Sequence, residues 1–418
     1  MKKLIGLLVL PMTVCGQSAL TWQDVKEKFE ASNPTLRAAR LNIDESRAQE
    51  ITAYLRPNPD FGTGVDQIVP FSTQPSPATG ASVYRPFLYV FPSFSISYLH
   101  ERDHKRELRL ESARKTTDIA ASTYADQART LLFNLRNAFV QVLQAKAVQQ
   151  NARENLTYWD KELDVNRRRL AAGDLAQVDL DRLELQRVQF ESDLETALVN
   201  LRTAKIQVLA LLNDRMPIDR FDLTGRYDFV DQMDPLEQFR NAASESRPDL
   251  KEAAQNVELA KANHQLAIAN GSTDPTFSVD FGRNPPVPFY LGASVSIPLR
   301  IFDRNQGEKA RTAVDIRRSE EARDATRAQV FADVDSAYYT VQSALNLLRP
   351  YRDKYLKLAE DTRNKVAFSY QNGGASLLDY LDAEKSFRDT RLAYLNLIGS
   401  YLNAAAQMNM AVGREVMP

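Results

Sequence analysis

Side chains capable of chemistry are few in this chain, and they lie far apart. Of 418 residues, only 3 are His and 1 is Cys. His100 and His104 are four residues apart with Glu101 and Asp103 nearby, so one helical turn could hold a metal ion. The same residues directly follow a strand-like segment, where a polar cluster at an interface is the alternative, and we expect no metal site. No nucleophile–base pair or phosphate-binding glycine loop is recognisable, so we expect no cofactor and no enzyme. Lys plus Arg total 53 against 54 Asp plus Glu, which gives no reason to expect nucleic acid as a partner.

The chain resembles itself at a spacing of 200 residues. The pairs that keep this offset include Gly173 and Gly373, Asp179 and Asp379, Glu184 and Glu384, and Asp103 and Asp303. One offset kept by several segments indicates a duplicated structural unit. We predict a first repeat at 20–213, a linker or equatorial element at 214–236, a second repeat at 237–413 and a tail at 414–418. A duplicated scaffold with few reactive side chains indicates a conduit rather than a catalyst.

The start of the chain has the features of an export signal. Residues 1–19 combine two Lys, a short apolar run and small residues near possible cleavage sites. The apolar run is too short to span a bilayer as a helix, which needs about 20 residues. Cys15 suggests bacterial N-terminal lipidation, although the residue before it should be small. An ordinary cleaved signal whose Cys is discarded is the alternative.

Four short segments alternate with a period of two, which is typical of β-strands. They lie at 61–69, 94–98, 277–282 and 291–299. Their polar positions are mostly Ser and Gly, as in a channel lining, and their aromatic ends suit transmembrane strands of about 9–11 residues. A half-buried soluble sheet is the alternative. Four strands cannot close a barrel and an open edge is not tolerated in lipid, so several copies must share one barrel.

Most of the remaining chain is predicted to be helical. Long helices are expected at about 101–170, 178–213, 306–370 and 377–412, and shorter ones at about 22–55 and 235–270. Gly173 and the pair Gly373 and Gly374 separate the long helices into two hairpins, and Pro350 should kink or break the third one. A 70-residue helix extends ~105 Å. Apolar residues at heptad spacing, such as Leu183 and Phe190, predict coiled-coil packing.

With its elements in this order, the chain resembles the bacterial outer-membrane efflux channels, the TolC-like proteins. The order of helix, strand pair, long helix, glycine turn and long helix is given twice. Its local signatures are Asn33-Pro34-Thr35-Leu36, Arg247-Pro248-Asp249-Leu250, Leu55-Arg56-Pro57-Asn58-Pro59, and Ile297-Pro298-Leu299 followed by Phe302-Asp303. The Pro-Asn-Pro form is similar to that of the heavy-metal-efflux branch.

The resemblance implies a mainly helical homotrimer in the bacterial outer membrane. Three chains would share a twelve-stranded β-barrel, and their helical hairpins would form an α-helical barrel in the periplasm. A periplasmic adaptor would dock on its tip and link it to an inner-membrane pump of RND type. The chain would be the passive exit duct of a tripartite efflux system. The alternatives are the outer-membrane duct of type I protein secretion and, less favoured, a periplasmic coiled-coil scaffold.

The resemblance also assigns residues to a gate at the periplasmic tip. Asp379 and Asp382 match two aspartates that ring the narrowest point of the tunnel. Three copies of each would place six carboxylates in one constriction, which would favour cations. The alternative is that both are solvated charges near a helix N-terminus.

The resemblance further implies a latch that holds the tip closed. Tyr370 matches a tyrosine that bonds to an aspartate of the other repeat, and Asp179 matches that aspartate. Ala375 stands where the family has an arginine, so the latch is partial, and one of Arg167, Arg168 or Arg169 is the substitute we consider. The expected adaptor contacts are the tip turns Gly173, Gly373 and Gly374.

Overall fold

The computed structural model describes residues 19–66, 68, 70–71, 73–84, 90–284 and 287–417. Residues 1–18, which contain most of the predicted export signal and Cys15, lie outside the described residues. The chain divides into two compact units. The first unit comprises Met1–Ala39, Tyr124–Pro248 and Ala328–Pro418, and the second comprises Arg40–Thr123 and Asp249–Arg327. Each unit therefore takes segments from both halves of the sequence.

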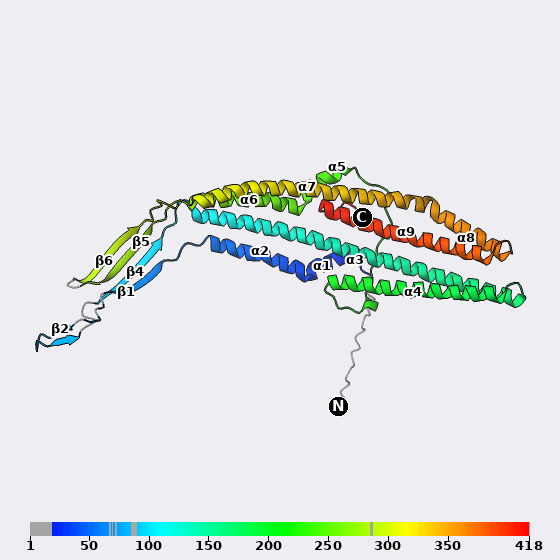
Figure 1. The fold of residues 1–418 in the computed structure, drawn as a ribbon, viewed down its shortest axis with the longest axis horizontal. Helices are drawn as coiled ribbons and strands as arrows, with labels where there is room; N and C mark the ends of the chain where they lie inside the picture. The colour runs from blue at the N-terminus through cyan, green and yellow to red at the C-terminus, as the bar shows by residue number, and fades with distance from the viewer. Residues whose placement is uncertain are drawn as a thin grey trace, which may run out of the picture. The chain divides into compact units, whose positions relative to one another are not determined.

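The second unit contains one antiparallel sheet built from both strand pairs. Its strands are β1 (Asp60–Asp66), β4 (Phe91–Leu99), β5 (Thr276–Asn284) and β6 (Val287–Ser296). They follow one another in the order β1-β4-β5-β6, so β1 and β6 are its edges (Figure 1). Phe94 on β4 lies opposite Phe281 on β5, and their rings stack with centroids 5.3 Å apart. Such cross-strand aromatic pairs stabilise the register.

Two strand predictions need correction. The alternating segment at 291–299 leaves the sheet after Ser296. Pro298 has no backbone N–H to donate a hydrogen bond to a neighbouring strand. The strand predicted from the alternating pattern was therefore too long at this end. The stretch between β1 and β4, for which no further strand was predicted, contains a small ribbon in which β2 (Thr73–Pro75) pairs with β3 (Ser82–Tyr84). Residues 67 and 69 of the predicted strand at 61–69 lie outside the described residues.

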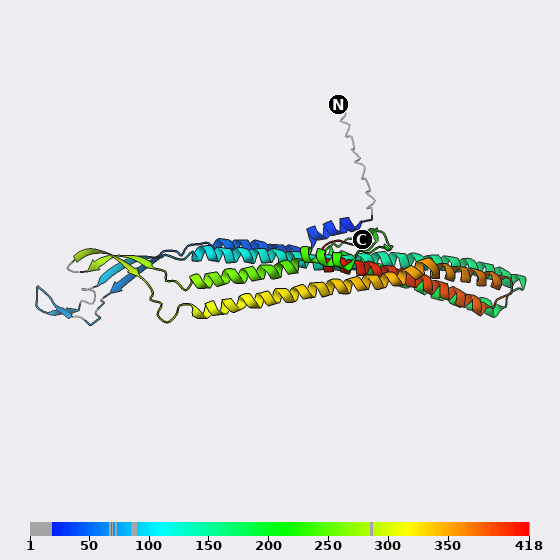
Figure 2. The same ribbon diagram turned by 90° about the horizontal axis from the view of Figure 1, so that it is seen from above.

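The long helices confirm the predicted pair of hairpins. The first hairpin is α3 (Lys105–Ala172) followed by α4 (Gln177–Leu211). The second is α7 (Gln306–Pro350), α8 (Leu356–Gln371) and α9 (Leu377–Val412), with a π-helical turn at Tyr351–Tyr355 between α7 and α8. Pro350 cannot donate a backbone hydrogen bond, and the regular helix ends at this residue as predicted. Figure 2 shows α8 turning back into α9 and α3 into α4.

The shorter helices are each divided in two, which corrects the prediction of single helices. α1 (Trp22–Ser32) is followed by α2 (Pro34–Ala53), and α5 (Leu236–Ser246) by α6 (Pro248–Ala269). The residue before each proline, Asn33 or Arg247, has an extended backbone with ψ of 120° or 117°. Proline disfavours the helical conformation of the preceding residue but is well suited to the first helical position. The break therefore follows from the local sequence.

The first unit has a hydrophobic core that includes the linker between the sequence repeats. Val25 and Phe29 of α1 pack with residues of α3 and α4, and Phe221 and Leu223 of the linker are buried among them. The linker also contains a short 3-10 helix, Ile218–Arg220. Burial of apolar area of this kind contributes about 25 cal/mol per Å². Among the helices of the described residues, none is long and apolar enough to cross a membrane.

Candidate functional site

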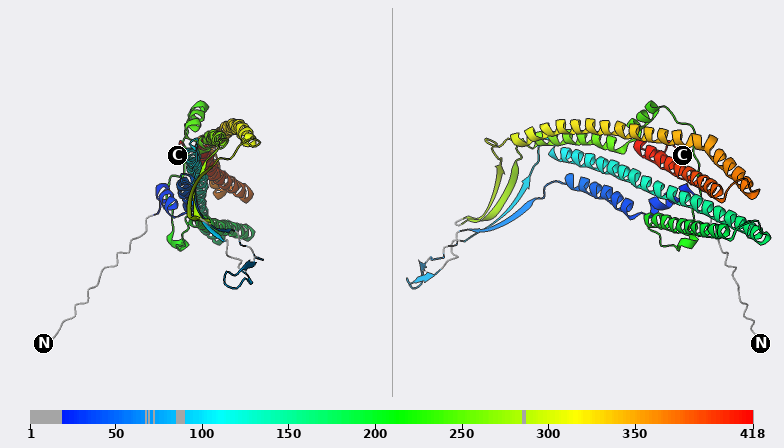
Figure 3. Two further views of the ribbon diagram at one scale, coloured as in Figure 1. Left: turned by 90° about the vertical axis from the view of Figure 1, so that its left-hand side faces the viewer. Right: turned by 45° about the vertical axis from the view of Figure 1, so that its right-hand side comes forward.

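Two glycine turns close the hairpins at one end of the first unit (Figure 3). Gly173 follows α3 with φ of +85°, and Gly373 follows the last turn of α8 with φ of +78°. Only glycine adopts this left-handed conformation without a steric penalty. The amide of Asp174 donates to the carbonyl of Arg169 at 2.8 Å, and the amide of Gly374 donates to that of Ser369 at 2.8 Å. The turns therefore have the same helix-ending geometry.

The predicted aperture residues Asp379 and Asp382 lie in the first turns of α9, and both are exposed. Asp379 belongs to a capping box with Ser376, whose hydroxyl donates to the Asp379 carboxylate at 2.7 Å and accepts from its backbone amide at 3.1 Å. The Ser376 backbone amide also donates to this carboxylate, at 3.0 Å. The two hydrogen bonds that the carboxylate accepts lower the pKa of Asp379, because they favour the charged form. Asp382 lies one turn later on nearly the same helix face.

The first repeat lacks this cap, so the two hairpins differ at equivalent positions. Ala176 stands where the second repeat has Ser376, and it makes no side-chain capping bond. Asp179 is half-buried and forms an ion pair with Arg182, three residues further on, at 3.6 Å. The duplication therefore preserved the fold of the tip but not its polar contacts.

The expected latch takes a different form in this chain. The Tyr370 hydroxyl donates to the side-chain oxygen of Asn166 at 3.4 Å, so its hydrogen bond is not made to Asp179, which instead pairs within its own helix. Asn166 is itself buried. The hydrogen bond between Tyr370 and Asn166 joins α8 to α3, and the role of Tyr370 and Asp179 in a latch stays a prediction.

Of the three candidate substitute arginines, one reaches Tyr370. The guanidinium carbon of Arg169 lies 5.2 Å from the centroid of the Tyr370 ring, a distance at which a cation and an aromatic face attract each other. Arg167 forms an ion pair with Glu184 at 3.0 Å, and Arg168 donates to the carbonyl of Asp164. The contact between α3 and α8 at this level therefore combines a cation, an aromatic ring and a buried amide.

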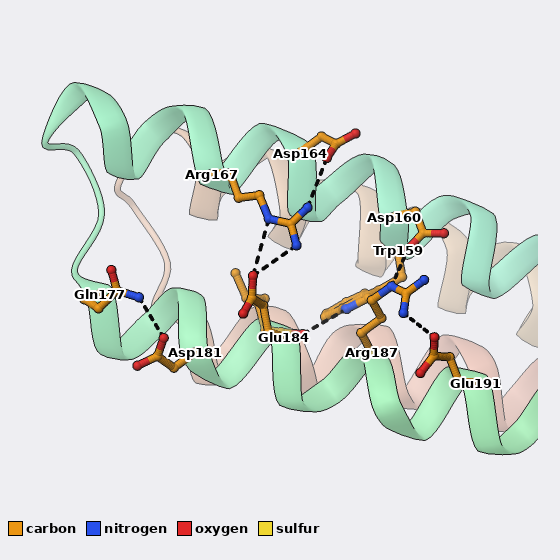
Figure 4. A network of polar contacts seen from close by, with 10 residues as sticks. Trp159, Asp160, Asp164, Arg167, Gln177, Asp181, Glu184, Arg187 and Glu191 are labelled. Atoms are coloured by element: carbon orange, nitrogen blue, oxygen red, sulfur yellow. Dashed lines mark hydrogen bonds and ion pairs between the residues drawn. The ribbon is translucent and has the colours of Figure 1, made fainter.

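The α3–α4 hairpin is also joined by ion pairs on its surface (Figure 4). Arg187 of α4 contacts Asp160 of α3 at 2.6 Å and Glu191 of its own helix. Exposed pairs of this kind contribute about 0–1 kcal/mol each, so they add specificity more than stability. The indole of Trp159, drawn beside them, donates to the carbonyl of Leu183 at 3.1 Å.

An aromatic stack joins the two hairpins at the tip, and sequence reasoning did not identify it. The ring of Tyr380 on α9 stacks on Tyr370 at 5.1 Å and on Trp159 at 6.1 Å, with interplanar angles of 3° and 7°. Trp159 in turn contacts Phe190 of α4 at 5.0 Å. Trp159 and Tyr380 are fully buried. Their rings therefore hold α3, α4, α8 and α9 together directly behind the glycine turns.

A buried carboxyl lies one helical turn beyond this stack, and it too was missed. Glu384 on α9 is only 7% exposed, and its Oε1 has no hydrogen-bond partner among the described residues. Burial raises the pKa of Glu384 to about 7, which the Arg363 guanidinium on α8 partly opposes. Burial also raises the pKa of Glu162 on α3. The spacing of Tyr380, Glu384 and Phe387 along one apolar helix face was the available signal.

This burial predicts that the stability of the tip depends on pH. The pKa of an unfolded glutamate is near 4.5, whereas the pKa of Glu384 in the folded protein is about 7. The stabilisation is therefore complete below pH 4.5 and is lost as the pH rises to about 7. The difference amounts to about 3 kcal/mol at most. We expect Glu384→Gln to remove this loss, as measured by hydrogen exchange of α9 amides at several pH values.

The control for this prediction is the equivalent residue of the first repeat. Glu184 is exposed and pairs with Arg167 on the surface, so Glu184→Gln should leave the pH dependence unchanged. An equal loss of protection with rising pH in the wild type and in Glu384→Gln would contradict the assignment to Glu384.

Comparison with known proteins finds similarity to outer-membrane efflux proteins. Residues 240–414 match the family described as outer membrane efflux protein. The cobalt-zinc-cadmium resistance protein CzcC of Cupriavidus metallidurans is 24% identical over 97% of this chain and 92% of its own. The outer membrane protein TolC of Escherichia coli is 20% identical over 99% of this chain and 87% of its own.

Solved structures of outer-membrane channels have the same fold. The CusC structure matches with a TM-score of 0.76 and 18% identity, over 94% of this chain and 92% of that one. The open state of the Neisseria gonorrhoeae MtrE channel matches with a TM-score of 0.73 and 18% identity, over 94% and 89% of the two chains. These likenesses confirm the fold class of long helical hairpins with a shared β-barrel.

The comparisons also confirm the predicted location and general role. Members of the family are trimeric, passive channels that work with adaptor proteins and inner-membrane pumps. Their helical part lies in the periplasm. Residues 240–414 thus match the outer membrane efflux protein family, the chain has the TolC-like fold, and its role is that of the outer-membrane duct of a tripartite efflux system.

Proposed function

We propose that the duct exports divalent metal cations and that its acidic tip favours their passage. The observation that carries the proposal is the pair of exposed carboxylates, Asp379 and Asp382, one turn apart at the start of α9. The capping box lowers the pKa of Asp379 and so keeps this carboxylate charged at neutral pH. A relative aligned over nearly the whole chain is named for resistance to cobalt, zinc and cadmium, which supports metal cations as the substrate class.

The tip also supports a proposal for the partners. The exposed turns that contain Gly173, Gly373 and Gly374 are the surface on which a periplasmic adaptor docks, because both hairpins end there. In this proposal the energy for transport comes from an inner-membrane pump of RND type, because channels of this family work with inner-membrane pumps. We further propose that Tyr370 and Asp179 help to hold the tip closed. Asn166 and Arg169 take part as the residues that contact Tyr370.

Deletion and complementation in the bacterium that carries this chain test the substrate class. Loss of the protein should raise cellular cobalt, zinc and cadmium and reduce growth in their presence, and the wild-type chain should restore both. The variant Asp379→Asn with Asp382→Asn should restore them only in part, whereas Asp361→Asn on the exposed face of α8 should restore them fully. Unchanged metal tolerance after deletion, together with a defect in protein secretion, would contradict the proposal.

A further inference from the structure

A group of polar side chains is enclosed where α3, α8 and α9 meet behind the tip. Glu384 of α9 faces Arg363 of α8, whose Nε lies 4.0 Å from a Glu384 oxygen. This separation is too long for a hydrogen bond. Tyr158 and Glu162 approach from α3. A hydrogen bond from Tyr158 lowers the pKa of Glu384, whereas repulsion by Glu162 raises it. The carboxyl is therefore removed from water without a cation in close contact to compensate its charge.

The remaining charged groups around Glu384 are already engaged. Arg388 on α9 lies near the carboxyl, but its guanidinium contacts Asp193 of α4 at 3.8 Å and covers the ring of Phe190. Arg391 of α9 forms an ion pair with Glu154 of α3 at 2.6 Å. Neither arginine is free to neutralise Glu384 without breaking a contact between helices.

Protons can reach this group through a small cavity. A space of about 200 Å³ lies against Glu384 and Arg363, whereas one water molecule occupies about 30 Å³ of liquid. Its other walls are Glu154, Asn155, Tyr158, Phe190, Phe387, Arg388 and Arg391. Several water molecules fit there, and they would allow the carboxyl to exchange protons with the solvent.

We propose that Glu384, together with Glu162, forms a proton-sensitive joint that keeps the tip closed while protonated and loosens α9 from α3 when ionised. The proposal rests on the proposed function of the tip as a gate. When Glu384 ionises, its charge is repelled by Glu162, and its Oε1 has no hydrogen-bond partner among the described residues. Moving α9 relieves both effects, because it admits water or brings the carboxylate into contact with Arg363. Protonation can shift an equilibrium between two conformations only if they bind the proton with different affinity, and this arrangement supplies that difference.

Movement at the joint is transmitted to the aperture through a short, stiff segment. Glu384 lies two residues after Asp382 and five after Asp379 on the continuous helix α9. Between them, Tyr380 is stacked on Trp159 and Tyr370. A shift of α9 at Glu384 must therefore displace both carboxylates and break the stack. The first repeat has no such joint, because Glu184 is exposed and paired with Arg167.

Single-channel recording of the full-length mature protein in planar bilayers tests the joint. The probe is KCl at equal concentration on both sides, with the pH raised from about 5 to about 8 to cover the titration range of a carboxyl raised in this way. Wild-type conductance should rise with a midpoint near pH 7. Glu384→Gln, which cannot ionise, should lose this rise and stay at the low value. Glu184→Gln should keep it.

The variant Asp379→Asn with Asp382→Asn separates the joint from the aperture. If the joint and the aperture are both as described, this variant loses cation preference but keeps the rise of conductance with pH. Unchanged ion selectivity would contradict the assignment of Asp379 and Asp382 to the aperture, but it would leave the test of the Glu384 joint intact. If the conductance of Glu384→Gln rises with pH as much as that of the wild type, the proposal that Glu384 forms a proton-sensitive joint is wrong.

Fluorescence gives a second test that needs no open channels. The chain has 2 Trp, so replacing Trp22 by Phe leaves Trp159 as the only reporter. Its emission should shift to longer wavelength as the pH rises through about 7, because the stack opens to water. This shift should be absent when Glu384→Gln is added. A shift that is the same with and without Glu384→Gln would overturn the proposal.

Discussion

Replacing Trp159 by Ala should destabilise the tip by about 3–5 kcal/mol, the cost usually measured for removing a large buried aromatic side chain. The side chain is fully buried and lies between Tyr380 and Phe190. Its removal leaves a cavity between the hairpins and takes away the hydrogen bond to the carbonyl of Leu183. Hydrogen exchange of the amides near Gly173 and Gly373 measures the effect locally, as the free energy of opening.

The control for this substitution is an aromatic residue that makes no comparable contacts. Phe368 on α8 is 69% exposed, so Phe368→Ala should change the local free energy of opening by no more than about 0.5 kcal/mol. Protection elsewhere in the first unit, for example around Phe29 in the other core cluster, should change little in either variant. Equal loss of protection in both variants would contradict the role given to the stack.

The double substitution Asp379→Asn with Asp382→Asn should reduce the preference for cations on the order of tenfold. A carboxylate ~8 Å from the axis of a water-filled constriction lowers the energy of a monovalent cation by about 0.5 kcal/mol at the dielectric constant of water. Three chains supply six such groups. Salt at about 0.1 M reduces each interaction by roughly half, because the Debye length is about 10 Å. The six interactions together lower the energy of a monovalent cation by ~1.5 kcal/mol, which corresponds to about a tenfold preference.

Asparagine suits this test because it removes charge while changing the shape of the side chain little. It retains an oxygen that can accept the hydrogen bond of the Ser376 hydroxyl, so the cap of α9 should persist. The ratio of cation to anion permeability follows from the reversal potential in a KCl gradient. Asp361→Asn, on the exposed face of α8, is the matched control and should leave that ratio unchanged. An unaltered ratio in the double variant would remove Asp379 and Asp382 from the aperture.

The elements that the sequence predicted well are those set by local patterns. The range Leu377–Val412 agrees with the expected helix, and both glycine turns have the positive φ that only glycine adopts readily. Period-two alternation located the core of all four strands of the sheet. The breaks at Asn33 and Arg247 were also encoded locally, by the proline that follows each of them, and were missed because helical periodicity was followed through them.

The contacts that the sequence could not predict are those between helices. Tyr370 and Asn166 are 204 residues apart, and nothing local to either residue indicates the other. Glu184 and Glu384 are identical at the 200-residue offset, yet one is exposed and the other is buried. Their environments differ because each hairpin packs different side chains against its neighbour. Duplication in the sequence therefore predicts that the two repeats have the same fold, but it does not predict that equivalent charged residues have the same burial and the same ion pairs.

The ion selectivity of the purified mature protein in planar bilayers shows whether the chain is a passive duct whose tip is narrowed by acidic side chains. Under a KCl gradient, we expect discrete channels of small conductance whose reversal potential shows a preference for cations. Anion-selective channels, or no channels from well-folded trimeric protein, would contradict this expectation.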